Sequence, residues 1–219
     1  QRIGGFTAPR SGRSAGAGGL AARRVMSGAA EAAVPIDGRC FTYVFPCAWE
    51  DFCKIGFSRD PLGRIGALHP RWFEFFDLHS GVLIETETVR DARDLELRLR
   101  GPLRAHRAPM PLTIRDAAGG QTEWFRGVAA PLATHVVELA QGGYRVLSLH
   151  GWLRAAALSR IDRLYDWADA QLSAEEREGL IARTPAGRAL GDVLDGYRSL
   201  DIDLTDRLSP AIARWYGKV

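Results

Sequence analysis

The patterned part of the chain begins with two short runs of aromatic and β-branched residues. They are CFTYVF at residues 40–45 and CKIGFS at residues 53–58, and seven residues lie between them. Two such runs with a medium-length connection are typical of a β-hairpin. The second run is unusual because Lys54 lies among apolar neighbours in what otherwise reads as a buried strand.

Three further elements follow the predicted hairpin. Residues 58–69 predict a helix, with Ser58 as its cap and Pro61 in its first turn. Residues 73–86 predict a third strand that is interrupted by a Ser-Gly pair, and residues 88–106 predict a helix that ends near a Gly-Pro pair. The expected order is therefore strand–strand–helix–strand–helix.

The last third of the chain has a different pattern. Residues 144–219 carry apolar side chains at helical spacing, a capping-box sequence SAEE, and two further helix starts at Thr-Pro and Ser-Pro. We interpret them as an all-α accessory region. Residues 36–143 then form an α+β domain. Residues 1–35 are rich in Gly, Ala, Ser and Arg, and we expect a disordered tail there.

Charge is distributed unevenly along the chain, whose formal net charge is +3. Residues 1–35 carry five arginines and one glutamate, whereas residues 36–126 carry equal numbers of basic and acidic side chains. Residues 1–25 precede Met26 and are interpreted as an upstream extension, with a transit peptide as the alternative. The tail supplies the basic character, so whole-chain charge only weakly supports nucleic-acid binding.

The sequence also argues against a membrane protein and a disulfide scaffold. No stretch approaches the roughly 20 apolar residues that a membrane helix needs, so we expect no membrane partner. Cys40, Cys47 and Cys53 are too few and too irregularly spaced for a disulfide framework, and no nearby histidine completes a zinc set. We expect free thiols and a cytoplasmic protein.

One carboxylate lies on the apolar face of the helix predicted over residues 88–106. Successive helix residues rotate by about 100°, so this face carries Val89, Ala92, Glu96, Leu99 and Leu103. Burying an unpaired carboxylate is costly. A metal ligand or active-site acid is therefore one interpretation, and a structural ion pair with an arginine is the second. The third is that the helix has a different phase, which would place Glu96 off the apolar face.

Three more polar residues can meet this carboxylate. Tyr43 and Lys54 lie on adjacent predicted strands and can point to one face of the sheet. Arg64 lies in the helix that follows. Together with Glu96 they form a candidate phosphate-handling cluster that is drawn from four successive elements.

This pattern resembles the GIY-YIG nuclease superfamily, most closely its branch of small phage-type and meiotically-upregulated-gene-type domains. The resemblance covers about residues 39–126. The matching positions are Tyr43 in TYVF, KIG at residues 54–56, Ser58 and Arg64 in a KIGxSxDPxxR pattern, Glu96 in LELRL, and EWF at residues 123–125.

The resemblance implies a three-stranded antiparallel sheet flanked by helices, and metal-dependent hydrolysis of a phosphodiester bond. Glu96 would hold one Mg²⁺ or Mn²⁺ ion, and Tyr43 would act as general base or proton relay. Lys54 and Arg64 would contact the scissile phosphate.

Three further residues are candidates for substrate binding. Ser58 follows the KIG motif but equally suits a helix cap, and His69 is a candidate helper after the Arg64 helix. Arg100 occupies a position where this branch often carries a histidine.

The substrate expected from the resemblance is DNA, cut with low sequence specificity. Six arginines crowd the Glu96 helix and its exit, and they either track a phosphate backbone or form a solvated charge lattice. They are Arg90, Arg93, Arg98, Arg100, Arg104 and Arg107.

Departures from the motifs leave other interpretations open. Phe41 or Thr42 replaces the glycine of the GIY half, and Lys54 replaces the tyrosine of the YIG half. The second interpretation is a catalytically weak module that binds nucleic acid, or a protein partner through residues 144–219. The third is an unrelated α+β protein.

Overall fold

Five antiparallel strands form one sheet, in the order β4-β2-β1-β3-β5, in a computed structural model that describes residues 39–217. The strands are β1 (Cys40–Pro46), β2 (Phe52–Ser58), β3 (Val82–Thr86), β4 (Trp124–Arg126) and β5 (Val146–Ser148). The predicted α+β class is confirmed. The predicted number of three strands is wrong, because two strands of three residues extend the sheet at its edges.

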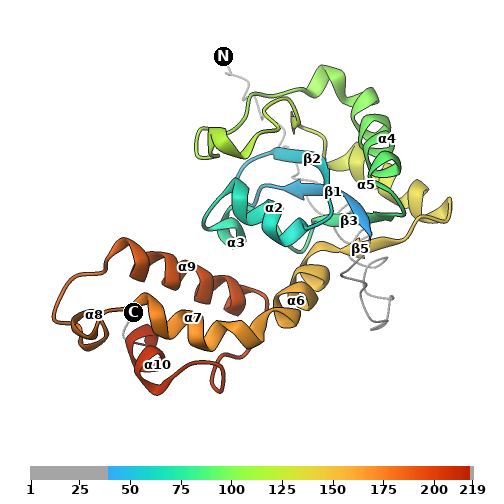
Figure 1. Cartoon of the computed structure of the whole chain (residues 1–219). Helices are drawn as coiled ribbons and strands as arrows, with labels where there is room; N and C mark the ends of the chain where they lie inside the picture. Colours follow the sequence, from blue (N-terminus) through green and yellow to red (C-terminus); the bar gives the residue numbers. More distant parts are fainter. Residues whose placement is uncertain (1–38, 218–219) are drawn as a thin grey trace, which may run out of the picture.

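Helices cover both faces of the sheet and continue beyond it (Figure 1). They are α2 (Pro61–Leu68), α3 (Trp72–Phe75), α4 (Val89–Arg100), α5 (Ala129–Gln141), α6 (Leu149–Ser159), α7 (Leu164–Gln171), α8 (Ala174–Glu178), α9 (Pro185–Ser199) and α10 (Pro210–Gly217), with the 3-10 turns η1 (Gly101–His106), η2 (Asp116–Ala118) and η3 (Ile161–Arg163). The predicted order of the first main elements is confirmed, and the one-turn helix α3 is additional.

The central strand β1 sends alternate side chains to the two faces of the sheet. Phe41, Tyr43 and Phe45 belong to a buried cluster that includes residues of α2 and α6. Val44 belongs to a second cluster with residues of α4 and α5, and Thr42 Oγ1 donates to a backbone carbonyl of α4 at 2.8 Å. The pairs α2/α6 and α4/α5 therefore lie on opposite sides of the sheet.

The strand predicted over residues 73–86 is only half right. Its second half forms β3, whereas its first half forms α3 and a turn. Asp77 closes that turn, because its Oδ1 atom accepts from the backbone N–H groups of His79 and Ser80 at 3.0 and 3.1 Å. Local side-chain bonds of this kind compete with strand pairing, so the aromatic run before Asp77 is not extended.

The region after residue 143 is not purely helical, which corrects the predicted all-α extension. β5 pairs with β3, and Leu149 and Trp152 of α6 join the buried cluster that contains Tyr43. The helices α7 to α10 gather beyond α6, in the orange and red part of Figure 1. The expected accessory region therefore contributes a strand and part of the core to the sheet.

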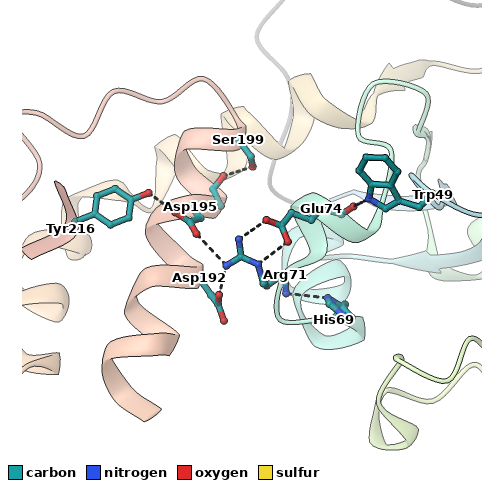
Figure 2. Close-up of polar contacts among 9 residues, drawn as sticks. Trp49, His69, Arg71, Glu74, Asp192, Asp195, Ser199 and Tyr216 are labelled. Atoms are coloured by element: carbon teal, nitrogen blue, oxygen red, sulfur yellow. Dashed lines mark hydrogen bonds and ion pairs between the residues drawn. The ribbon is translucent and has the colours of Figure 1, made fainter. Parts of the chain in front are cut away.

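A polar network centred on an arginine joins α3 to α9 and α10 (Figure 2). Arg71 Nη1 donates to Asp192 at 2.6 Å and to Asp195 at 3.1 Å, and Arg71 Nη2 pairs with Glu74 at 2.5 Å. Tyr216 Oη of α10 donates to Asp195 at 2.6 Å. One set of bonds thus joins α3 to two consecutive helices that lie more than a hundred residues later in the sequence.

Three further predictions concern the N-terminal tail, the cysteines and membrane-spanning helices. The tail predicted over residues 1–35 lies outside the described residues. The three cysteines are free thiols, as predicted. Within residues 39–217, no helix is both long enough and apolar enough to span a lipid bilayer.

Candidate functional site

Tyr43 lies in the central strand with only 1% of its surface exposed. It is paired with Gly56 of β2 on one side and with Leu83 of β3 on the other. A Cβ atom at position 56 would lie 2.4 Å from the Tyr43 hydroxyl oxygen. The KIG motif therefore needs its glycine, because the tyrosine ring occupies the space that any side chain would take.

Arg64 is positioned by the first turns of α2. Asp60 caps this helix, since its side chain accepts from the backbone N–H of Gly63 at 3.1 Å. The predicted cap, Ser58, instead accepts from the N–H of Asp60 at 3.0 Å, so the prediction was two residues early. Arg64 Nε donates to Tyr43 Oη at 3.1 Å, which brings two predicted catalytic residues into direct contact.

Lys54 is fully buried, but its ammonium group has partners. It lies on the same face as Tyr43, as predicted. Nζ donates to Glu123 Oε2 and to Gly120 O, each at 2.9 Å, and lies 5.1 Å from the centre of the Trp124 ring. Burial lowers the pKa of Lys54, and the Glu123 carboxylate opposes that shift. A lysine is tolerated inside this strand because these partners satisfy its charge.

Glu96 is buried on α4, with 4% of its surface exposed, as the helical periodicity predicts. Ala92 and Leu99 are buried beside it, whereas Val89 at the helix start is exposed. Glu96 Oε1 accepts from Arg100 Nη1 at 2.6 Å. The structural ion pair considered from the sequence is therefore present, and its partner is Arg100, a predicted substrate-binding residue.

Glu96 meets the cluster at an edge of the sheet. Its helix covers the face opposite Tyr43, but β4 pairs with β2 only from Phe52 to Lys54. One more backbone bond, from Ile55 N to Glu123 O at 3.1 Å, follows that pairing. Glu96 interacts electrostatically with both Lys54 and Glu123.

Burial governs the proton affinities in this cluster. It raises the pKa of Glu96, with the Arg100 hydrogen bond opposing the shift and the Glu123 carboxylate adding to it. It raises the pKa of Tyr43 to about 12, although Arg64 acts in the opposite direction. The Tyr43 phenol therefore keeps its proton at neutral pH unless more positive charge is placed beside it.

Glu123 is a cluster member that the sequence pattern did not identify. Its backbone carbonyl accepts from the N–H of Ile55 at 3.1 Å, which fixes it beside β2. It lies 69 residues from Lys54 along the chain, and helical or strand periodicity carries no information over that separation. The sequence feature that could have indicated Glu123 is the EWF motif, in which it precedes two aromatic residues that are buried, Trp124 and Phe125.

The residues before Glu123 lie against the cluster, and we call residues 115–122 the cover segment. Three of its backbone carbonyls accept from the three basic side chains of the cluster. The bonds run from Arg64 Nη1 to Ala118 O, from Lys54 Nζ to Gly120 O and from Arg100 Nη2 to Thr122 O. Each cation thus has a backbone partner.

Two predicted substrate-binding residues make local contacts instead. Ser58 holds the turn between β2 and α2. His69 Nδ1 accepts from the N–H of Arg71 at 3.1 Å, and its ring stacks on Phe75 with 4.8 Å between ring centres. Their contact with a substrate stays a prediction.

The cluster contains two carboxylates, and each is paired with a cation of the cluster. Glu96 and Glu123 carry carboxylate oxygens, the donors that Mg²⁺ and Mn²⁺ prefer, and the Glu123 carboxylate helps to raise the pKa of Glu96. Residues 39–217 contain no group of three or more His, Cys, Asp or Glu side chains placed to hold a metal. A cation at this edge would therefore keep several water ligands.

No family model, curated protein or solved structure matches this chain. The resemblance to GIY-YIG nucleases therefore rests on the motif residues and their arrangement.

Proposed function

We propose that this protein is a metal-dependent endonuclease of the GIY-YIG type that hydrolyses phosphodiester bonds in DNA with low sequence specificity. The observation that carries the proposal is that Tyr43, Lys54, Arg64 and Glu96 gather from four elements. Arg64 bonds Tyr43 at 3.1 Å, and Tyr43 and Lys54 each interact electrostatically with both Arg64 and Glu96. Buried titratable groups with shifted pKa values are typical of functional sites.

Each side chain has a role that its surroundings support. Arg64 offers a planar guanidinium suited to two oxygens of a phosphate, and Lys54 offers a compact charge. Tyr43 is oriented by Arg64 and is suited to relay a proton from the attacking water. Glu96 would hold a divalent cation, which would supply charge stabilisation for the leaving oxygen. Burial raises the pKa of Tyr43 to about 12, and Arg64 acts in the opposite direction.

The surface around the cluster supports a polyanionic substrate. Exposed arginines continue from α4 through η1 and beyond it, and sequence-independent contacts of this type follow a phosphate backbone. These arginines are Arg93, Arg104 and Arg107.

The ion pairs favour a second candidate function. Glu96 is neutralised by Arg100, and Lys54 by Glu123, so the charges that would act on a phosphate already have partners. The second candidate is a module that binds nucleic acid without cutting it.

The proposal is tested by cleavage of supercoiled plasmid and circular single-stranded DNA in Mg²⁺, Mn²⁺ or EDTA. We expect metal-dependent cutting that Glu96→Gln lowers by more than about 100-fold, because even outer-shell partners of a metal change activity about 10–100-fold. A Glu96→Gln protein that cuts at the wild-type rate would contradict the proposal. Binding without cutting by the folded wild type would favour the second candidate.

The matched control is Glu176→Gln. Glu176 is a buried glutamate in α8 that accepts from Thr184 N at 2.9 Å and from Thr184 Oγ1 at 2.8 Å. This variant also loses a buried charge, but it should keep the wild-type rate of cleavage because it leaves the cluster intact.

A further inference from the structure

The cover segment resembles the ligand that the candidate site should bind. A phosphodiester backbone presents a series of acceptor oxygens, and the cover segment presents three alternate carbonyl oxygens. These carbonyls, of Ala118, Gly120 and Thr122, are bonded to Arg64, Lys54 and Arg100. The oxygens therefore engage all three basic side chains of the cluster.

The cover segment has few apolar anchors, and Ala118 is its one residue packed against the buried core. Six of its eight residues are exposed and the other two are half-buried, while buried Ile114 and Trp124 fix the chain on either side. Gly119 and Gly120 have φ angles of 65° and 69°, a region that glycine enters readily. A segment with few buried apolar contacts opens at low free energy.

The bonds to the cover leave one donor of the site unused. Arg100 Nε is buried, and no described residue accepts from it. A carbonyl has one oxygen, whereas a phosphate presents several and can accept from both Nε and Nη2 of one guanidinium. The cluster also holds three cations against two carboxylates, which leaves positive charge for an anionic ligand.

We propose that the cover segment is an autoinhibitory mimic of a nucleic-acid backbone, which the phosphates of the substrate displace from Arg64, Lys54 and Arg100. The inference rests on the proposed function, because it concerns the same site. It adds that the resting protein is closed and that Arg100 is the third phosphate-binding residue. Substrate affinity is then lowered by the fraction of molecules that are closed.

Gly120→Ala separates this proposal from a purely structural role of the segment. A Cβ atom at position 120 would lie 2.5 Å from Lys54 Nζ, 3.0 Å from Arg64 Nη2 and 2.4 Å from Glu123 Oε2. The variant should therefore keep the cover from closing on the cations. Gly119→Ala is the matched control, because it places alanine at a similar positive φ with no atom within 4 Å of its Cβ.

The readout is the affinity of each protein for a fluorescent phosphorothioate oligothymidylate in EDTA, measured by anisotropy. If about nine molecules in ten are closed, Gly120→Ala should bind about tenfold more tightly than Gly119→Ala and wild type. Equal affinity of the two glycine variants, or no binding by any of them, would overturn the proposal.

Hydrogen exchange on the wild type tests displacement without relying on a variant that folds. Amides of residues 115–122 should exchange faster when the oligonucleotide is bound, and unchanged or slower exchange would overturn the proposal.

Two outcomes separate this proposal from the proposed nuclease function. If Gly120→Ala binds more tightly but does not cut in Mg²⁺ or Mn²⁺, the cover segment is inhibitory and the nuclease function is wrong. If the wild type cuts as fast as Gly120→Ala, the nuclease function stands and the inhibitory role of the cover segment is wrong.

Discussion

At the scale of single residues, the candidate site depends on one close approach. Tyr43 lies over Gly56, and this arrangement brings the phenol to Arg64 Nε. Lys54, two residues before Gly56 and on the same face, has its ammonium group directed to Glu123. The KIG motif therefore combines a glycine, which leaves room for the Tyr43 ring, with a buried lysine that is paired with Glu123.

We predict that Gly56→Ala destabilises the fold by about 1–3 kcal/mol, the usual effect of overpacking a buried site. The added methyl group would lie 2.4 Å from the Tyr43 hydroxyl, and the ring has to move away from Arg64. Urea denaturation measures the loss.

Gly66→Ala is the control for this substitution. Gly66 lies in α2, and a Cβ atom there would meet only Trp72 Cδ1, at 3.9 Å. Replacing a helical glycine with alanine in open space should raise stability by about 0.5–1 kcal/mol. Equal losses in the two variants would contradict the steric account of the KIG motif.

At the scale of elements, periodicity predicted the long helix α4 and missed the two three-residue strands. The burial of Glu96 followed from a helix of twelve residues, over which an apolar stripe is visible. β4 and β5 have three residues each, and alternation over three positions is indistinguishable from chance. The N-terminal part of the strand predicted over residues 73–86 failed because the Asp77 turn overrides the β propensity of its aromatic residues.

The contacts that join distant elements were also invisible in the sequence. The approach of Glu123 to Lys54 depends on how the chain returns to the edge of β2 after α4. The same holds for Arg71, whose partners Asp192 and Asp195 lie more than a hundred residues later.

We predict that Arg71→Ala lowers the free energy of unfolding by about 1 kcal/mol, at the lower end for hydrogen bonds to charged groups because the side chain is partly exposed. The substitution leaves Asp192, Asp195 and Glu74 without their shared cation (Figure 2). Thermal unfolding followed by circular dichroism checks the loss.

Arg90→Ala is the control for the Arg71 network. Arg90 is an exposed residue of α4, and its one ion pair, with Asp94, spans 4.0 Å. We expect its stability to equal that of the wild type. A loss as large as that of Arg71→Ala would show that the Arg71 network adds nothing beyond an ordinary surface charge.

At the scale of the whole molecule, the sheet and the later helices share one buried cluster. It runs from Tyr43 and Phe45 of β1 through Trp152 of α6 to Ile212 and Trp215 of α10. The candidate site lies at the β2 edge, beside α4 and the cover segment. Ala118 is the one residue of the cover segment that packs against this cluster. The proposed opening of the cover is therefore a local change at the edge.

The most direct test of this account is the rate at which Gly120→Ala cuts circular single-stranded DNA in Mn²⁺, with and without Glu96→Gln in the same chain. We predict that Gly120→Ala cuts faster than the wild type, and that EDTA or the added Glu96→Gln abolishes the cutting. Cutting by the double variant at the rate of Gly120→Ala would contradict the account, because the activity would not depend on the carboxylate on which the proposed mechanism rests.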